Sequence, residues 1–91
     1  MSTEIYSILT HITDRPPTAS AHAFKSRPQA NARARALLRQ WGRPAEEWMD
    51  ENGLFHGAYE GKDNDGEDER VEVWVVKLTV VDEDGHGEEE E

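Results

Sequence analysis

The chain contains no cysteine, and this absence excludes disulfide frameworks, thiolate zinc sites and cysteine nucleophiles. It also lacks long hydrophobic runs, so no segment approaches the length of a membrane span. The N-terminus has no basic stretch followed by an apolar one, which a secretory signal would require. The 91 residues suffice for one small domain, and we expect that domain to be cytoplasmic.

Positive charge is scarce in the second half of the chain. Residues 1–45 carry seven lysines and arginines against two acidic residues, whereas residues 46–91 carry three against eighteen. The first half therefore has a balance of +5 and the second a balance of −15, in agreement with the total of −10. Such an asymmetry concerns what the protein binds rather than how it folds.

The residue patterns predict four strands and one main helix. Ser26 and Gln29 fit a capping box, with Pro28 in the first turn, and Gly42 suits the end of the helix. The apolar stripe of this helix consists of Ala30, Ala34, Leu37, Leu38 and Trp41. β-branched, aromatic and alternating residues indicate strands over residues 4–12, 18–24, 54–60 and 71–81.

This order of elements predicts an α+β two-layer sandwich, in which an antiparallel sheet of about four strands (order β-β-α-β-β) packs against the main helix. Small residues on one face of the second strand would leave room for the helix; they are Ala19, Ala21 and Ala23. We expect Trp41 to be buried against one of these alanines and against the inward face of residues 71–81. Residues 44–50 are compatible with a second short helix, because a proline and two glutamates suit its first turn. Residues 1–81 would form the domain, and residues 82–91, rich in glycine and glutamate, a disordered acidic tail.

The strand predicted over residues 71–81 has apolar side chains on both faces. One side carries Val71, Val73 and Val75, and the other carries Trp74, Val76, Leu78 and Val80. Such a strand is either covered on both faces or uses one face as an interface. A homodimer through this strand is one arrangement that the pattern allows.

Neither catalysis nor metal binding emerges from the sequence. The carboxylates lie mostly in loops expected to be solvated, where they are poorly placed for acid–base chemistry. The loop around Gly66 has partial EF-hand spacing, but Gly61 takes the place of the first carboxylate ligand. His11 and His22 could face each other on adjacent strands, yet a zinc site needs further ligands. We therefore expect a non-enzymatic protein without metal or cofactor.

The helix carries a basic face that is a candidate for nucleic-acid binding. Arg35, Arg39 and Arg43 recur at intervals of four residues, and Arg33 lies nearby. Clustered guanidinium groups of this kind bind phosphates. Against this hypothesis, an acidic protein is repelled from a polyanion at long range, and the arginines could instead pair with acidic residues of the same chain.

The acidic surface suggests a cationic protein as the partner instead of a nucleic acid. Dense carboxylates beside an exposed aromatic ring can occupy a protein groove that normally holds a phosphate backbone. The alternative is that the acidic loop only keeps the protein soluble. The candidate surface for binding a cationic protein consists of Asp63, Asp65, Glu67, Asp68, Glu69 and Tyr59.

Three segments define the predicted architecture: the hairpin EIYSILTHITDRPPTASAHAF, the helix PQANARARALLRQWG and the acidic hairpin GLFHGAYEGKDNDGEDERVEVWVVKL. Together they resemble small phage-encoded inhibitors of host defence, especially anti-CRISPR proteins. The resemblance is one of size, charge and element order, without a signature motif. It implies a stoichiometric inhibitor that blocks the nucleic-acid site of a larger complex, while the arginine-rich helix supports a second hypothesis, a small regulator that binds nucleic acid.

Overall fold

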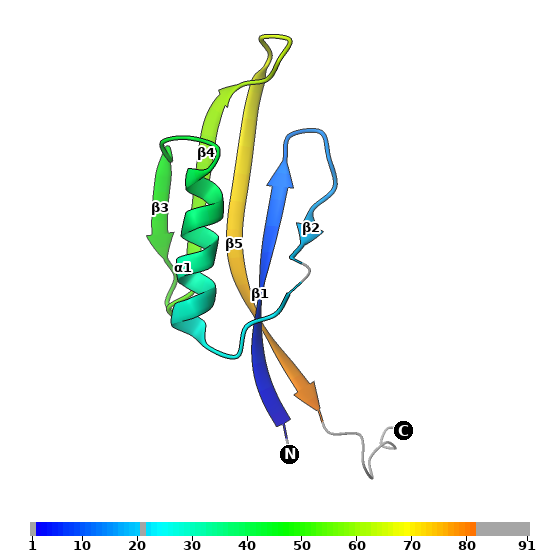
Figure 1. Ribbon diagram of the computed structural model, residues 1–91, viewed down its shortest axis with the longest axis vertical. Helices are drawn as coiled ribbons and strands as arrows, with labels where there is room; N and C mark the ends of the chain where they lie inside the picture. The colour runs from blue at the N-terminus through cyan, green and yellow to red at the C-terminus, as the bar shows by residue number, and fades with distance from the viewer. Residues whose placement is uncertain (1, 21, 82–91) are drawn as a thin grey trace.

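The computed structural model describes residues 2–20 and 22–81, so the predicted acidic tail at residues 82–91 lies outside the described part of the chain. The elements are β1 (Ser2–Ile12), β2 (Thr18–Ala19), α1 (Arg27–Arg39), β3 (Glu46–Met49), β4 (Phe55–Lys62) and β5 (Asp68–Val81) (Figure 1). The strands form one antiparallel sheet in the order β2-β1-β5-β4-β3. The predicted α+β class is confirmed, but the sheet has five strands rather than about four. None of the helices in these residues is long and apolar enough to span a bilayer.

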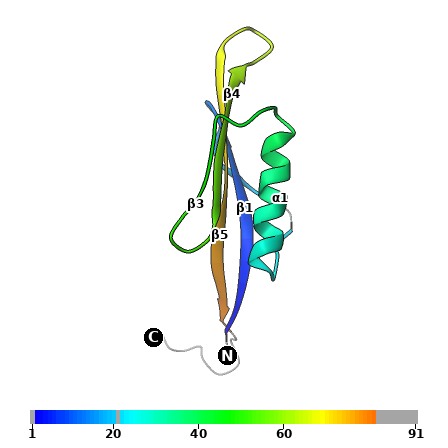
Figure 2. The ribbon, with the colours of Figure 1, turned by 90° about the vertical axis from the view of Figure 1, so that its left-hand side faces the viewer.

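The helix packs on one face of the sheet, as the two views of the ribbon show (Figure 2). Ser26 caps its N-terminus as predicted, since the Ser26 hydroxyl accepts the N–H of Gln29 at 3.4 Å and Pro28 lies in the first turn. The core between helix and sheet consists of Ile8, Ala30, Ala34, Leu38, Leu54, Phe55, Val71, Val73 and Val75. Three positions of the predicted helical stripe are thus fully buried, and Leu37 packs against them from the margin.

Trp41 is the member of the stripe that the structure places elsewhere. The helix ends at Arg39, and Gly42 then adopts a φ of 148° that turns the chain away from the helical path. Trp41 therefore lies beyond the last turn, and 42% of its surface is exposed. The expectation that it is buried in the core was wrong.

The second predicted strand is much shorter than residues 18–24. The hairpin with β1 is confirmed, but its ladder consists of Thr18 and Ala19 alone, followed by an isolated bridge between Tyr6 and Phe24. The Ser20 hydroxyl donates to the carbonyl of His22 at 2.6 Å, a local bond that competes with a regular ladder. Ala19 and Ala23 are exposed, and Ala21 lies outside the described residues, so the helix packs on β1, β4 and β5 instead.

Residues 44–50 do not form the second helix that the sequence allowed. Glu46–Met49 is the edge strand β3, which pairs with β4 from Glu46 opposite Ala58 to Met49 opposite Phe55. The glutamates are compatible with a helix, but pairing with β4 satisfies the backbone and overrides a weak local preference. Asn52 and Gly53 lie in the turn between β3 and β4, where Gly53 has a φ of 75°.

The longest strand, β5, lies at the centre of the sheet. Val71, Val73 and Val75 face the helix and are at most 1% exposed. The sequence predicted that these three side chains share one face but did not indicate which face of the strand is the buried one. The alternate side chains point to the face that no described element covers; they are Trp74, Val76, Leu78 and Val80. The pairing of β1 with β5 runs from Ser2 opposite Val81 to Ile12 opposite Val71, whereas β4 pairs with β5 only over residues 68–74.

Candidate partner-binding surfaces

The β4–β5 hairpin projects beyond the rest of the sheet at one end of the molecule (Figure 1). The ladder of β3 reaches β4 only as far as Ala58, and the ladder of β1 reaches β5 only as far as Val71. Residues 60–69 therefore form a two-stranded extension with a tight turn at its tip. The acidic loop around Gly66 is therefore the connection of a β-hairpin.

Hydrogen bonds from the loop backbone hold the tip of the hairpin in a defined shape. One carboxylate oxygen of Asp63 accepts the N–H groups of Asp65 and Glu67, each at 2.9 Å. Gly66 has a φ of 80°, which glycine adopts without strain. A surface that is already ordered before binding loses less conformational entropy when a partner docks.

The side chains of the tip are turned to solvent. Asp63, Asp65, Glu67 and Asp68 are exposed, and Glu69 is half-buried. Lys62 pairs with Asp68 at 2.5 Å, but both side chains are exposed, and such pairs contribute little to stability. Five carboxylates against one ammonium group therefore give residues 61–69 a formal charge of −4.

Arg70 gathers three glutamates on the uncovered face at the base of the hairpin. It donates to Glu46 at 2.7 Å, to Glu72 at 3.1 Å and also to Glu60. The hydrogen bonds to Glu46 and Glu72 raise the pKa of Arg70 above its usual value. Three carboxylates and one guanidinium group leave a formal charge of −2 here, against −4 for residues 61–69, so most of the negative charge at this end lies at the tip.

Two aromatic residues lie on the helix side of the same hairpin base. Tyr59 is half-buried, and its ring lies so close to Gly42 and Gly61 that a Cβ at either position would fall 2.7 Å or less from a Tyr59 atom. The exposed ring is that of Trp41, whose centroid lies 6.4 Å from that of Tyr59. The sequence therefore indicated an aromatic anchor beside the acidic loop but identified Tyr59 where Trp41 is the more accessible side chain.

The four arginines assigned to a basic helix face do not share one face. Arg35 lies over the ring of Phe55, with its guanidinium carbon 5.3 Å from the ring centroid, and Arg39 pairs with Glu47 at 3.1 Å. Arg33 is two residues before Arg35, which places it on the opposite flank of the helix. Arg43 lies after the end of α1. The internal pairing that the sequence left open is thus present for Arg39.

A polar cluster closes the turn between β3 and β4. The Nε2 atom of His56 lies 2.9 Å from Asp50, and the His56 ring stacks on Trp48 with centroids 5.1 Å apart. The other oxygen of Asp50 accepts the N–H groups of Asn52 and Leu54 at 2.8 and 3.0 Å. The hydrogen bond with His56 and then that from Leu54 hold the pKa of Asp50 below its usual value. The cluster stabilises the turn that orients the start of β4.

The histidines that could have formed a metal site are apart from one another. His11 lies 3.6 Å from Glu72 on the uncovered face, and His22 is exposed in the connection after β2. Among residues 2–20 and 22–81, no group of three or more potential ligands is close enough to hold a metal ion.

A scan against protein-family models and searches of curated proteins and of solved structures found no significant match for this chain.

Proposed function

We propose that the chain is a small non-enzymatic protein-binding module that docks its acidic hairpin on a cationic surface. The charge and the order of the tip support this proposal most directly, because four exposed carboxylates and the half-buried Glu69 are carried on a backbone fixed by Asp63. Ordered negative charge speeds encounter with a basic partner and selects against acidic ones.

The exposed ring of Trp41 gives this surface a hydrophobic anchor. Interfaces gain most of their affinity from a few large side chains, and tryptophan is among the commonest of them. Trp41 lies at the base of the acidic hairpin through its contact with Tyr59. Carboxylates for steering and an indole for affinity form a surface suited to a protein site that otherwise holds a nucleic-acid backbone. We infer that the module acts as an inhibitor of such a complex, of the kind that phages encode against host defence.

A competition assay tests the proposal. A guide-loaded CRISPR effector complex would be mixed with labelled target DNA, and displacement of the DNA by this protein would be followed by fluorescence anisotropy. We expect the wild-type chain to displace DNA and a fourfold charge reversal at the tip to abolish displacement. Asp63 is kept because its carboxylate shapes the turn; the reversed residues are Asp65, Glu67, Asp68 and Glu69, each to lysine.

The matched control reverses four glutamates at the far end of the sequence, Glu88–Glu91, to lysine and so changes the net charge by the same amount. This control should displace DNA as well as the wild type. Equal loss in both variants, or displacement by neither the wild type nor the control, would contradict a site at the hairpin. Binding of the protein itself to random DNA or RNA, abolished by Arg33→Glu with Arg43→Glu, would instead establish the nucleic-acid-binding hypothesis.

A further inference from the structure

Within the described residues, the C-terminal part of β5 pairs with another strand on one side only. Its pairing with β4 ends at Trp74 opposite His56, while its pairing with β1 continues to Val81. Residues 76–81 therefore form one strand of a two-stranded ribbon, and no strand of the described residues pairs with the outer edge of this segment (Figure 1). Free strand edges are templates for pairing with another chain.

The direction of the backbone groups at this edge follows from the ladder. The backbone carbonyl of Arg70 accepts the N–H of Thr13 at 3.0 Å, and the backbone N–H of Arg70 donates to the Thr13 hydroxyl at 2.8 Å. The backbone groups of Arg70 therefore point toward β1. Because this direction alternates along a strand, Lys77 and Thr79 point theirs at the open edge. They have no backbone partner there among the described residues.

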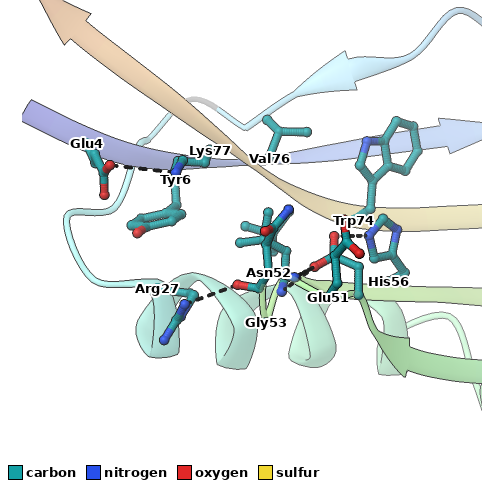
Figure 3. Close-up of a pocket in the computed structure, with 13 residues that line it drawn as sticks. Glu4, Tyr6, Arg27, Glu51, Asn52, Gly53, His56, Trp74, Val76 and Lys77 are labelled. Carbon is teal, nitrogen blue, oxygen red and sulfur yellow. Dashed lines mark hydrogen bonds and ion pairs between the residues drawn. The ribbon is translucent and has the colours of Figure 1, made fainter.

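A groove of about 840 Å³ runs along the start of this edge (Figure 3). Its walls include Tyr6 and Arg27 on the helix side and the turn after β3, where Arg27 donates to the carbonyl of Asn52 at 3.1 Å. Trp74 and Val76 project on the other side of the strand. The groove leaves space for an additional strand beside β5.

The side chains beside this edge are apolar on the uncovered face. Leu78 and Val80 are 47% and 49% exposed, and Val76 is half-buried. On the helix face the same segment carries Lys77, which lies 3.6 Å from Glu4 of β1. Two copies of such a segment are complementary to each other, because each presents an apolar row on one face and a balanced ion pair on the other.

We propose that a second copy of this chain occupies the edge, with β5 pairing antiparallel to β5 of the partner across a two-fold axis. The backbone N–H and C=O groups that point at the open edge belong to odd-numbered residues. The two strands can therefore exchange hydrogen bonds only in registers that place odd-numbered residues opposite one another. Pairing centred on Lys77 would oppose two ammonium groups, which is unfavourable. Centring on Leu78 instead pairs Lys77 with Thr79 of the partner and brings the two Leu78 side chains together as a close, non-hydrogen-bonded pair. Centring on Thr79 places Leu78 opposite Val80 of the partner instead, which also gives apolar contacts on the uncovered face.

The charge distribution is compatible with this arrangement. Ten residues separate Leu78 from Asp68, about 33 Å of strand, so antiparallel pairing places the two acidic tips roughly 60 Å apart. That separation is several Debye lengths at physiological salt. Each copy nevertheless carries a net charge of −10, so two copies repel each other at low salt. Added salt should therefore strengthen the dimer, whereas it should weaken docking of the acidic hairpin on a cationic partner.

Sedimentation equilibrium of the full chain tests the proposal. A paired segment of five residues is a small interface, so we expect a dissociation constant on the order of 100 µM, decreasing between about 50 mM and about 500 mM NaCl. Thr79→Pro removes only an N–H that points at the open edge, so the β1 ladder stays intact. It should weaken dimerisation at least roughly tenfold. Thr79→Val keeps the N–H and the branched side chain and serves as the matched control.

Two results would overturn the proposal: a wild-type chain that stays monomeric at about 500 µM in high salt, or equal dimerisation of the proline and valine variants. Amide hydrogen exchange of the wild type provides a readout that does not depend on variant folding. The amides of Lys77 and Thr79 should become protected as the protein concentration rises. If their exchange is independent of concentration, a second copy does not occupy this edge. Because the DNA displacement assay uses dilute protein and the hairpin variants, its failure would leave this test unaffected.

Discussion

Trp41 lies against Tyr59, with ring centroids 6.4 Å apart and ring planes inclined by 33°, at the base of the acidic hairpin. Tyr59 packs inward against the core, while Trp41 stays 42% exposed. The Tyr59 ring therefore has a structural role, and the Trp41 ring is available to a partner. The distinction follows from the end of α1 at Arg39, which places Trp41 outside the helix.

Replacement of Trp41 by alanine should affect binding more than folding. We expect the free energy of unfolding to fall by less than about 1.5 kcal/mol, because the ring is half-exposed, and partner affinity to fall by about tenfold or more. Leu38→Ala is the comparison, since Leu38 is fully buried and its truncation should cost about 2–5 kcal/mol. Urea denaturation and the DNA displacement assay measure the two effects. A loss of stability for Trp41→Ala that equals that of Leu38→Ala would place the indole in the core after all.

The helix and the central strand could be predicted from the sequence because their signals are local. Ser26 and Pro28 mark the start of α1 within four residues, and the alternating residues of β5 show which side chains share a face. Which of the two apolar faces is buried depends on where the helix packs. The edge strand β3 could not be predicted, because Glu46 and Glu47 carry no strand signal until β4 lies beside them.

The acidic surface and its surroundings could be predicted only in part, because some of their features are local in the sequence and others depend on the folded arrangement. The acidic tip is contiguous in the sequence, so its charge could be recognised directly. The cluster around Arg70 depends on the register of three strands, which brings together residues 46, 60, 70 and 72. The exposure of Trp41 depends on where the helix ends, and Gly42 and Pro44 allowed more than one endpoint.

Asn31 joins the helix to the β3–β4 turn, and its loss should destabilise the fold. Its side-chain amide donates to the carbonyl of Gly53 at 2.8 Å and accepts the N–H of Phe55 at 3.0 Å. Asn31→Ala leaves the buried N–H of Phe55 and the half-buried carbonyl of Gly53 without this partner, so we expect a loss of about 2–4 kcal/mol in urea denaturation. Gln29→Ala, on the exposed side of the same helix, should cost less than about 0.5 kcal/mol. Comparable losses for the two variants would contradict a bridging role for Asn31.

Arg70 should contribute more to stability than an ordinary surface arginine because it serves three carboxylates at once. Arg70→Met keeps much of the aliphatic stem but leaves Glu46, Glu60 and Glu72 to repel one another. We expect a loss of about 1–2 kcal/mol, decreasing with added salt because the interaction is electrostatic. Lys62→Met removes a single exposed pair and should cost at most about 0.5 kcal/mol. If the two variants are equally stable at low salt, the three glutamates are not held by Arg70 in solution.

Asp50 should make the β3–β4 turn sensitive to acid. The hydrogen bond with His56 and those from the loop backbone lower the pKa of Asp50 in the folded protein below the unfolded value of 3.8. The unfolded chain therefore takes up this proton first as the pH falls. The stabilisation is complete above the unfolded pKa and is lost as the pH falls through the folded pKa.

Asp50→Asn removes the charge while keeping an oxygen that can accept from the backbone. We expect this variant to have a lower urea midpoint than the wild type at neutral pH, with the difference decreasing below about pH 4 as Asp50 becomes protonated. Glu51→Gln is the matched control, because Glu51 is the neighbouring residue and its side chain is exposed; its midpoint should follow that of the wild type at every pH. A difference for Asp50→Asn that stays constant down to about pH 2 would mean that the carboxylate acts through its shape rather than its charge.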